Sequence, residues 1–206
     1  MLTFIERPAL VAASPTPLLV LLHGYGATEE DLAWLAHQVD PRVRVVLPRA
    51  PIRVPDVLGY QWYDPKGLGH PDEAELKTSL LALSALLAHL SGEDGGGRTP
   101  LLLGGFSQGG LMTAAYGARR LRPRPSALLI LSGYLPPDQP LPDLEGLPVF
   151  LGHGTDDPVI NVAWGLGLAH RLERAGARVE VHTYPGGHGL HPTELTDVLA
   201  FIRRQI

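Results

Sequence analysis

The chain has 206 residues, of which 45% are hydrophobic and 18% are charged, and its formal net charge is −4 at pH 7. This size and composition predict one globular domain over residues 1–206 and exclude intrinsic disorder. A nucleic-acid binder would carry an excess of Lys and Arg, so the acidic balance argues against that class. The chain contains no cysteine, which excludes disulfides, cysteine nucleophiles and thiolate metal sites.

The N-terminal segment lacks the pattern of a secretory signal. Charged residues interrupt its apolar stretch, and the run from Pro8 to Ala13 is too short for the apolar core of a signal peptide. The longest apolar runs of the chain are also far shorter than a bilayer span. We therefore expect a cytoplasmic protein without stable membrane insertion.

Short apolar segments predict the strands of a parallel sheet. They cover residues 18–22, 43–47, 101–103, 128–131, 149–151 and 179–184. Strands that are apolar along their whole length need cover on both faces, as in a parallel sheet packed under helices. The last segment alternates more and is expected near an edge. Residues 2–6 and 10–13 are expected to form a leading antiparallel hairpin.

Helical patterns lie between these strands. Thr28 and Asp31 form a capping-box pattern ahead of a first helix. Further helices are expected over residues 72–90 (ended by Gly92 and the glycines at 95–97), 108–121, 162–175 and 192–202. The alternation predicts a three-layer α/β/α sandwich with a mostly parallel central sheet. Two Pro-rich stretches, 50–71 and 133–146, match neither pattern and are candidates to line a site.

The segment Gly105-Phe106-Ser107-Gln108-Gly109 fits the pattern G-x-S-x-G. It follows a predicted strand and precedes a predicted helix, which is the setting that a nucleophile elbow requires. The flanking glycines allow a sharp turn, and the helix aims free N–H groups and the positive end of its dipole at the turn. Ser107 is therefore the candidate nucleophile.

A serine hydroxyl reacts as a nucleophile only when a base takes its proton and a carboxylate orients that base. Candidates for both follow later strands, in the order serine, aspartate, histidine, which is the order that this fold class uses. Asp157 is preferred over Asp156 because Pro158 restricts its backbone to extended conformations. His188, in a glycine-flanked loop, is preferred over His191, which is expected to begin a helix.

The turn His23-Gly24-Tyr25-Gly26 follows the strand at 18–22. It can present the backbone N–H of Tyr25 to an oxyanion, with the N–H of Gln108 as the second donor. His23 and His153 are interpreted as buried hydrogen-bonding residues rather than bases.

A metal site offers a weaker interpretation of the same region. His188 and His191, with Asp156 and Asp157, supply ligand types for a divalent ion. The chain offers no clear helical pair of histidines, however, and the serine constellation already accounts for these residues. We therefore expect no metal site.

These segments resemble the carboxylesterase, phospholipase and acyl-protein thioesterase family of the α/β-hydrolase superfamily. The resemblance covers the chain from about Leu18 to its C-terminus. It rests on four stretches, Leu21–Gly26, Gly104–Gly110, His153–Val159 and Gly187-His188. It implies an α/β-hydrolase fold, cofactor-free hydrolysis of esters or thioesters with Ser107, Asp157 and His188 as the triad, and it allows a homodimer.

The expected function is hydrolysis of carboxylic esters with short to medium acyl chains. Residues 133–146 are too short and too rich in proline for a helical cap, so we expect an open site. Its expected pocket residues are Trp62, Tyr63, Leu135 and Ile160. Three alternatives stay open: a thioesterase acting on acyl-proteins or acyl-CoA, a perhydrolase that uses peroxide, and a non-catalytic ligand-binding module on a hydrolase scaffold.

Overall fold

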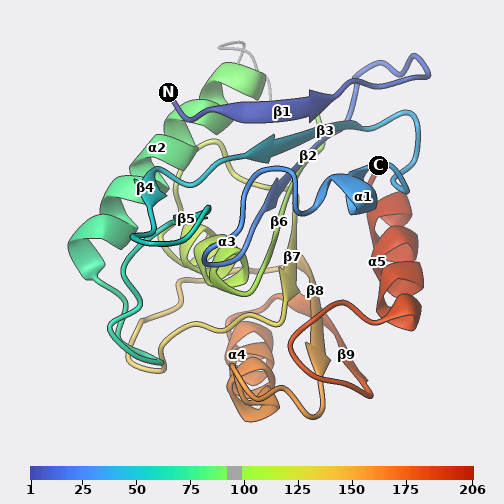
Figure 1. Cartoon of the computed structure of the whole chain (residues 1–206). Coiled ribbons are helices and arrows are strands. Elements are labelled where there is room, and N and C mark those ends of the chain that lie inside the picture. Colours follow the sequence, from blue (N-terminus) through green and yellow to red (C-terminus); the bar gives the residue numbers. More distant parts are fainter. Residues whose placement is uncertain (92–98) are drawn as a thin grey trace.

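The computed structural model describes residues 1–91 and 99–206 and has a seven-stranded, mostly parallel sheet at its centre (Figure 1). The strand order is β1-β3-β2-β6-β7-β8-β9. These strands are β1 (Phe4–Arg7), β2 (Leu18–Leu22), β3 (Arg44–Pro48), β6 (Leu101–Phe106), β7 (Ala127–Leu131), β8 (Pro148–Gly154) and β9 (Arg178–Tyr184). All pairings are parallel except that of β1 with β3. The predicted mostly parallel sheet is confirmed, and β9 lies at an edge as expected.

Helices cover both faces of this sheet (Figure 1). They are α1 (Ala33–Ala36), α2 (Glu73–Ser91), α3 (Gln108–Ala118), α4 (Val162–Arg174) and α5 (Pro192–Arg204). Helices α2, α3 and α4 pack on one face, while α1 and α5 pack on the other. The structure is thus the predicted three-layer α/β/α sandwich, and its described residues contain no cap domain.

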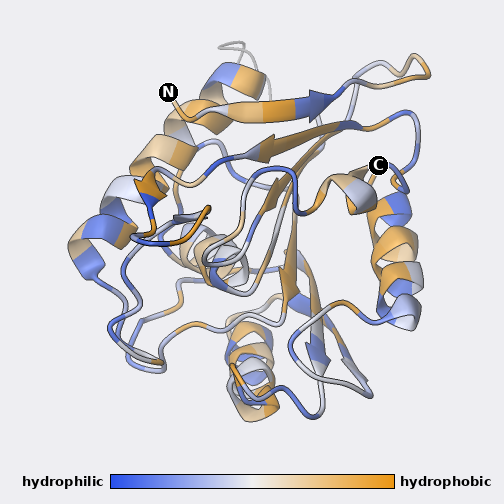
Figure 2. Ribbon diagram, viewed as in Figure 1, coloured by the Kyte–Doolittle hydropathy of each residue, from blue (hydrophilic) through white to orange (hydrophobic). Residues whose placement is uncertain are grey.

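The two cores explain why the central strands are apolar along their whole length. In β2, Leu18, Val20 and Leu22 pack under α2 and α3, whereas Leu19 and Leu21 pack under α1 and α5. Successive side chains of a strand point to opposite faces, so every residue of a doubly covered strand is buried. In Figure 2 the central strands are largely in the hydrophobic colours, whereas the helices carry both hydrophobic and hydrophilic residues.

Two expectations about the first half of the chain were wrong. Residues 10–13 form no strand, and β1 pairs instead with β3, where Ile5 lies opposite Leu47. The open edge of the sheet gives β1 a longer apolar partner than a local hairpin would. The expected irregular stretch 50–71 contains a two-stranded hairpin, β4 (Ile52–Arg53) with β5 (Tyr60–Gln61).

Helix boundaries also differ from the expected ones. Asp31 accepts hydrogen bonds from the N–H and hydroxyl of Thr28, but these close a turn, and α1 begins only at Ala33. Helix α3 ends at Ala118, three residues earlier than expected, because Arg120 adopts a φ of 50°. The glycines expected to end α2 lie outside the described residues. No helix among the described residues is long and apolar enough to cross a membrane.

Candidate active site

Ser107 lies at a tight turn between β6 and α3. Its φ of 56° is in the left-handed region, which is uncommon for a residue with a side chain. The turn depends on close backbone contacts on both sides, because a Cβ on Gly105 would lie 2.3 Å from the oxygen of Gly109. A Cβ on Gly109 would lie 2.1 Å from the oxygen of Leu22. Only glycine fits at these positions, so the local sequence forces the serine out at the carboxyl edge of the sheet.

The loop between β9 and α5 brings His188 to this serine. Nε2 of His188 lies 2.8 Å from the Oγ of Ser107, although 81 residues separate the two in the chain. On the other side of the ring, Nδ1 lies 2.7 Å from Oδ2 of Asp157. A carboxylate can only accept, so Nδ1 carries the proton and Nε2 is left with the lone pair that accepts from the serine hydroxyl.

Asp157 is held in place by the backbone that follows it. Its Oδ1 accepts the N–H groups of Val159 at 2.8 Å and Ile160 at 2.9 Å. Burial alone would raise the pKa of Asp157, but the hydrogen bonds from His188 and from these two N–H groups outweigh it and keep the pKa below its usual value. The carboxylate is therefore ionised at neutral pH, as an orienting group must be.

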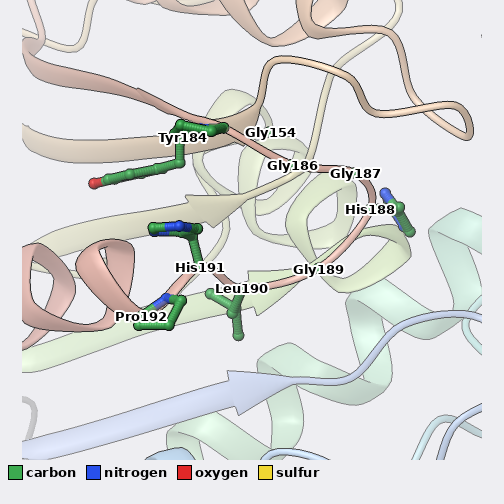
Figure 3. A pocket seen from close by; sticks show the side chains of 10 residues that line it. Gly154, Tyr184, Gly186, Gly187, His188, Gly189, Leu190, His191 and Pro192 are labelled. Atoms are coloured by element: carbon green, nitrogen blue, oxygen red, sulfur yellow. The ribbon is translucent and has the colours of Figure 1, made fainter.

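The neighbouring candidates lie elsewhere. Asp156 accepts a hydrogen bond from the hydroxyl of Thr155 and does not contact His188. Nδ1 of His191 accepts the N–H of Thr193 and caps α5. Tyr184, His188 and His191 all line a pocket of about 320 Å³, and in Figure 3 the ring of His188 points away from the other two side chains. No group of three or more metal-ligating side chains occurs in the described residues.

Two free backbone N–H groups flank the serine. Those of Tyr25 and Gln108 have no hydrogen-bond acceptor in the described parts of the chain. The turn after β2 lies directly against Ser107, since a Cβ on Gly24 would be 3.4 Å from the Cβ of Ser107. Both N–H groups belong to segments that follow adjacent strands, β2 and β6.

All four expected pocket residues are buried. Trp62 has an exposed fraction of 0%, and Tyr63, Leu135 and Ile160 are at most 4% exposed. Leu135 lines a groove of about 260 Å³ together with Trp164 and Leu168. The indole of Trp62 makes a buried hydrogen bond, in which its Nε1 donates to the backbone oxygen of His23.

Sequence reasoning overlooked the exposed apolar side chains next to the candidate site. Tyr25 and Val159 each lie within two residues of a site residue and are 50% and 58% exposed. Val57 is 45% exposed, and its Cγ1 is 3.9 Å from the position of a Cβ on Gly26. Tyr25 and Val159 belong to the stretches that carry the family resemblance, whereas no motif contains Val57.

The fold and this hydrogen-bonded set define an α/β-hydrolase of the serine hydrolase class. Residues 5–206 match the profile of a family described as phospholipase/carboxylesterase. The chain belongs to this family and is a carboxylic ester hydrolase.

Individual relatives agree with this assignment. Acyl-protein thioesterase 1 of Gibberella zeae is 31% identical over 95% of this chain and 93% of that protein. The enzyme of the same name from Mycosarcoma maydis is 32% identical over 93% of this chain and 92% of its own length.

Solved structures show the same fold. The crystal structure of esterase PE8 has a TM-score of 0.85 at 30% identity and covers 100% of this chain and 99% of that one. The Bacillus cereus carboxylesterase has a TM-score of 0.88 at 25% identity, covering 100% of this chain and 95% of its own.

Proposed function

We propose that this protein hydrolyses carboxylic esters of short to medium acyl chain length through a covalent acyl-serine intermediate. The observation that carries the proposal is the unbroken path from Oγ of Ser107 through His188 to Asp157, with contacts of 2.8 and 2.7 Å. Each atom in this path has the donor or acceptor character that its role requires.

In the first step, Oγ of Ser107 attacks the carbonyl carbon of the ester while its proton moves to Nε2 of His188. The N–H groups of Tyr25 and Gln108 stabilise the negative oxygen of the tetrahedral intermediate. The bond to the leaving alcohol then breaks, and that alcohol takes the proton from His188. Asp157 stabilises the imidazolium that forms in between.

In the second step, a water molecule attacks the acyl-serine carbonyl and gives a proton to Nε2 of His188. The bond between the acyl group and Oγ of Ser107 breaks, and the serine recovers that proton. The carboxylic acid leaves and the enzyme returns to its starting state. No further group is needed for the balance of atoms and charge.

The proposed substrate size rests on the segment between β7 and β8, where a helical cap would be inserted. In the described chain, the segment between β7 and β8 contains neither helix nor strand, which supports a site without a helical cap. We propose that Leu135 and the groove beside it contribute one wall, and that the exposed side chains of Tyr25, Val57 and Val159 contribute to the rim. These small apolar surfaces suit soluble esters rather than lipid aggregates.

The deciding experiment is a chain-length series of chromogenic esters on the wild type and on Ser107→Ala. We expect a maximum rate at short to medium chains and no jump at the substrate's micellar threshold. Ser107→Ala should lose at least ~10⁴-fold in rate while remaining folded, since it removes the nucleophile. A variant within a few-fold of the wild type would refute the assignment.

A second candidate, thioester hydrolysis on acylated proteins, is favoured by the names of the fungal relatives. Matched ester and thioester substrates with the same acyl chain separate the two activities. A fluorophosphonate probe tests the non-catalytic alternative, because only an activated serine is labelled. Absence of labelling at Ser107 in folded protein would support a binding module instead.

A further inference from the structure

Three buried polar side chains lie between the two proposed oxyanion donors. Gln108, Trp62 and His23 have exposed fractions of 5%, 0% and 1%. Their side chains take no part in the proton transfers described above. A buried polar group costs stability unless it is hydrogen-bonded, so the partners of each one show what it holds in place.

The side chain of Gln108 joins the start of α3 to the segment after β5. Its Oε1 accepts the N–H of Trp62 at 2.7 Å, and its Nε2 donates to the oxygen of Tyr63 at 2.7 Å. Among side chains of this length only an amide offers both an acceptor and a donor. Gln108 therefore presents its backbone N–H beside Ser107 while its side chain anchors the neighbouring segment.

The indole of Trp62 carries the connection to the end of β2. Its Nε1 donates to the backbone oxygen of His23 at 3.0 Å. The backbone oxygen of Trp62 accepts a hydrogen bond from the hydroxyl of Ser79 on α2. Trp62 is thus fixed at its N–H, its carbonyl and its ring, and it holds the residue just before the oxyanion turn.

The ring of His23 completes the connection in a single tautomer. Its Nε2 lies 3.1 Å from the N–H of Ala50 and must accept, because an amide N–H can only donate. The ring proton is therefore on Nδ1, which donates to the oxygen of Gly24 at 2.8 Å. Burial lowers the pKa of His23, which keeps the ring neutral at neutral pH.

This last hydrogen bond determines where the N–H of Tyr25 points. The carbonyl of Gly24 and the N–H of Tyr25 belong to one planar trans peptide unit, in which the two groups point in opposite directions. Since the carbonyl faces the buried ring of His23, the N–H of Tyr25 faces away from it. On that side it has no acceptor in the described chain.

We propose that Trp62 and His23 are positioning residues that hold the two oxyanion donors, the N–H groups of Tyr25 and Gln108, at a fixed separation and direction through one continuous path of hydrogen bonds. The inference rests on the proposed function. It assigns Trp62 a positioning role, whereas the sequence predicted that Trp62 lines the substrate pocket. Because the path aims existing donors, its loss weakens transition-state stabilisation more than substrate binding.

The first test is Trp62→Phe, which removes the indole N–H and keeps an aromatic ring in the core. We expect kcat to fall on the order of 10–100-fold with KM within twofold, less than the 10²–10³-fold that follows complete loss of one oxyanion donor. The affinity for a tetrahedral boronate inhibitor should fall by the same factor as kcat/KM. The matched control is Tyr116→Phe on α3, the helix that Gln108 begins. It removes the hydrogen bond from the Tyr116 hydroxyl to the backbone oxygen of Pro123 and should leave kcat unchanged.

A second pair of variants keeps the test independent of the folding of Trp62→Phe. Asn at position 23 places an amide N–H where Nδ1 was and retains the donor to Gly24, whereas Gln places its amide near the former Nε2 and loses that donor. We expect His23→Asn to retain kcat within a few-fold and His23→Gln to lose at least ~10-fold, both being folded by circular dichroism. A merely structural role predicts that both variants lose stability and neither shows this split.

The outcomes separate the inference from the proposed function. An inert wild type would overturn the proposed function and the inference with it. An active wild type that loses its activity in Ser107→Ala supports the proposed function. Given that result, a Trp62→Phe variant with the kcat and boronate affinity of the wild type overturns only the inference. If Trp62→Phe does not fold, wild-type kcat and boronate affinity in both His23 variants overturn it instead.

Discussion

Asp157 contacts His188 through Oδ2 alone, at 2.7 Å from Nδ1, because its Oδ1 is occupied by two backbone N–H groups. One carboxylate oxygen is thus used to fix the aspartate and the other to fix the histidine. The imidazole proton must lie on the side facing Asp157, and the lone pair must face Ser107.

Asp157→Asn should lower kcat by about 10⁴-fold, because an amide can donate to Nδ1 and so favour the wrong tautomer of His188. The measurement is steady-state hydrolysis of a short ester. The matched control is Asp156→Asn, which changes the adjacent aspartate and should leave kcat within a few-fold, since the carboxylate of Asp156 accepts from the hydroxyl of Thr155 and has no hydrogen bond to His188. Equal losses in both variants would contradict the assignment.

His191→Ala should change stability and leave catalysis intact. Its Nδ1 accepts the N–H of Thr193 at the start of α5, so its loss should cost about 1 kcal/mol in the free energy of unfolding. His188→Ala should show the reverse, with little loss of stability and almost no hydrolysis. Urea unfolding and ester hydrolysis on both variants check the pair, and a catalytic defect in folded His191→Ala would count against it.

Glu194 makes the stability of the protein depend on pH. It is 1% exposed, its Oε1 has no partner in the described chain, and a Cβ on Gly152 would lie 2.3 Å from that oxygen. Burial, together with the charge of Asp197, raises the pKa of Glu194 to about 7, while the N–H of His191 acts in the opposite direction. The folded protein therefore holds this proton at a pH where the unfolded chain releases it.

The stabilisation from the Glu194 proton is fully present below the ordinary pKa of 4.5 and is lost as pH rises through about 7. Glu194→Gln should therefore match the wild type at pH 4.5 and exceed its stability at pH 8 by roughly 2–3 kcal/mol. Urea unfolding at the two pH values measures this difference. Glu30→Gln, at an exposed position, should show no such change.

Two helical glycines should respond in opposite ways to alanine. Gly109→Ala should destabilise the protein by at least ~2 kcal/mol and abolish hydrolysis, because its Cβ would overlap the backbone of Leu22. Gly167→Ala, in the exposed face of α4 with no atom near its Cβ, should stabilise by about 0.5–1 kcal/mol. Thermal unfolding of both variants provides the measurement, and a stable, active Gly109→Ala would contradict the tight elbow.

Local sequence determined the elements that depend on neighbouring residues. The apolar runs predicted the central strands, and helical spacing predicted α2, α4 and α5 to within two residues at each end. The motif around Ser107 predicted its turn, because the glycines at 105 and 109 leave the backbone few alternatives. Short-range steric effects and hydrophobic periodicity involve residues close together in the chain, so the local sequence predicts their outcome.

Only the tertiary structure decided which distant groups meet. The pairing of β1 with β3 and the burial of Trp62 against His23 each join segments far apart in the chain. Such choices depend on sheet register and on the direction of individual side chains. A one-residue shift of register moves each side chain of a strand to the opposite face of the sheet. The residues next to each segment in the chain do not specify its distant partner.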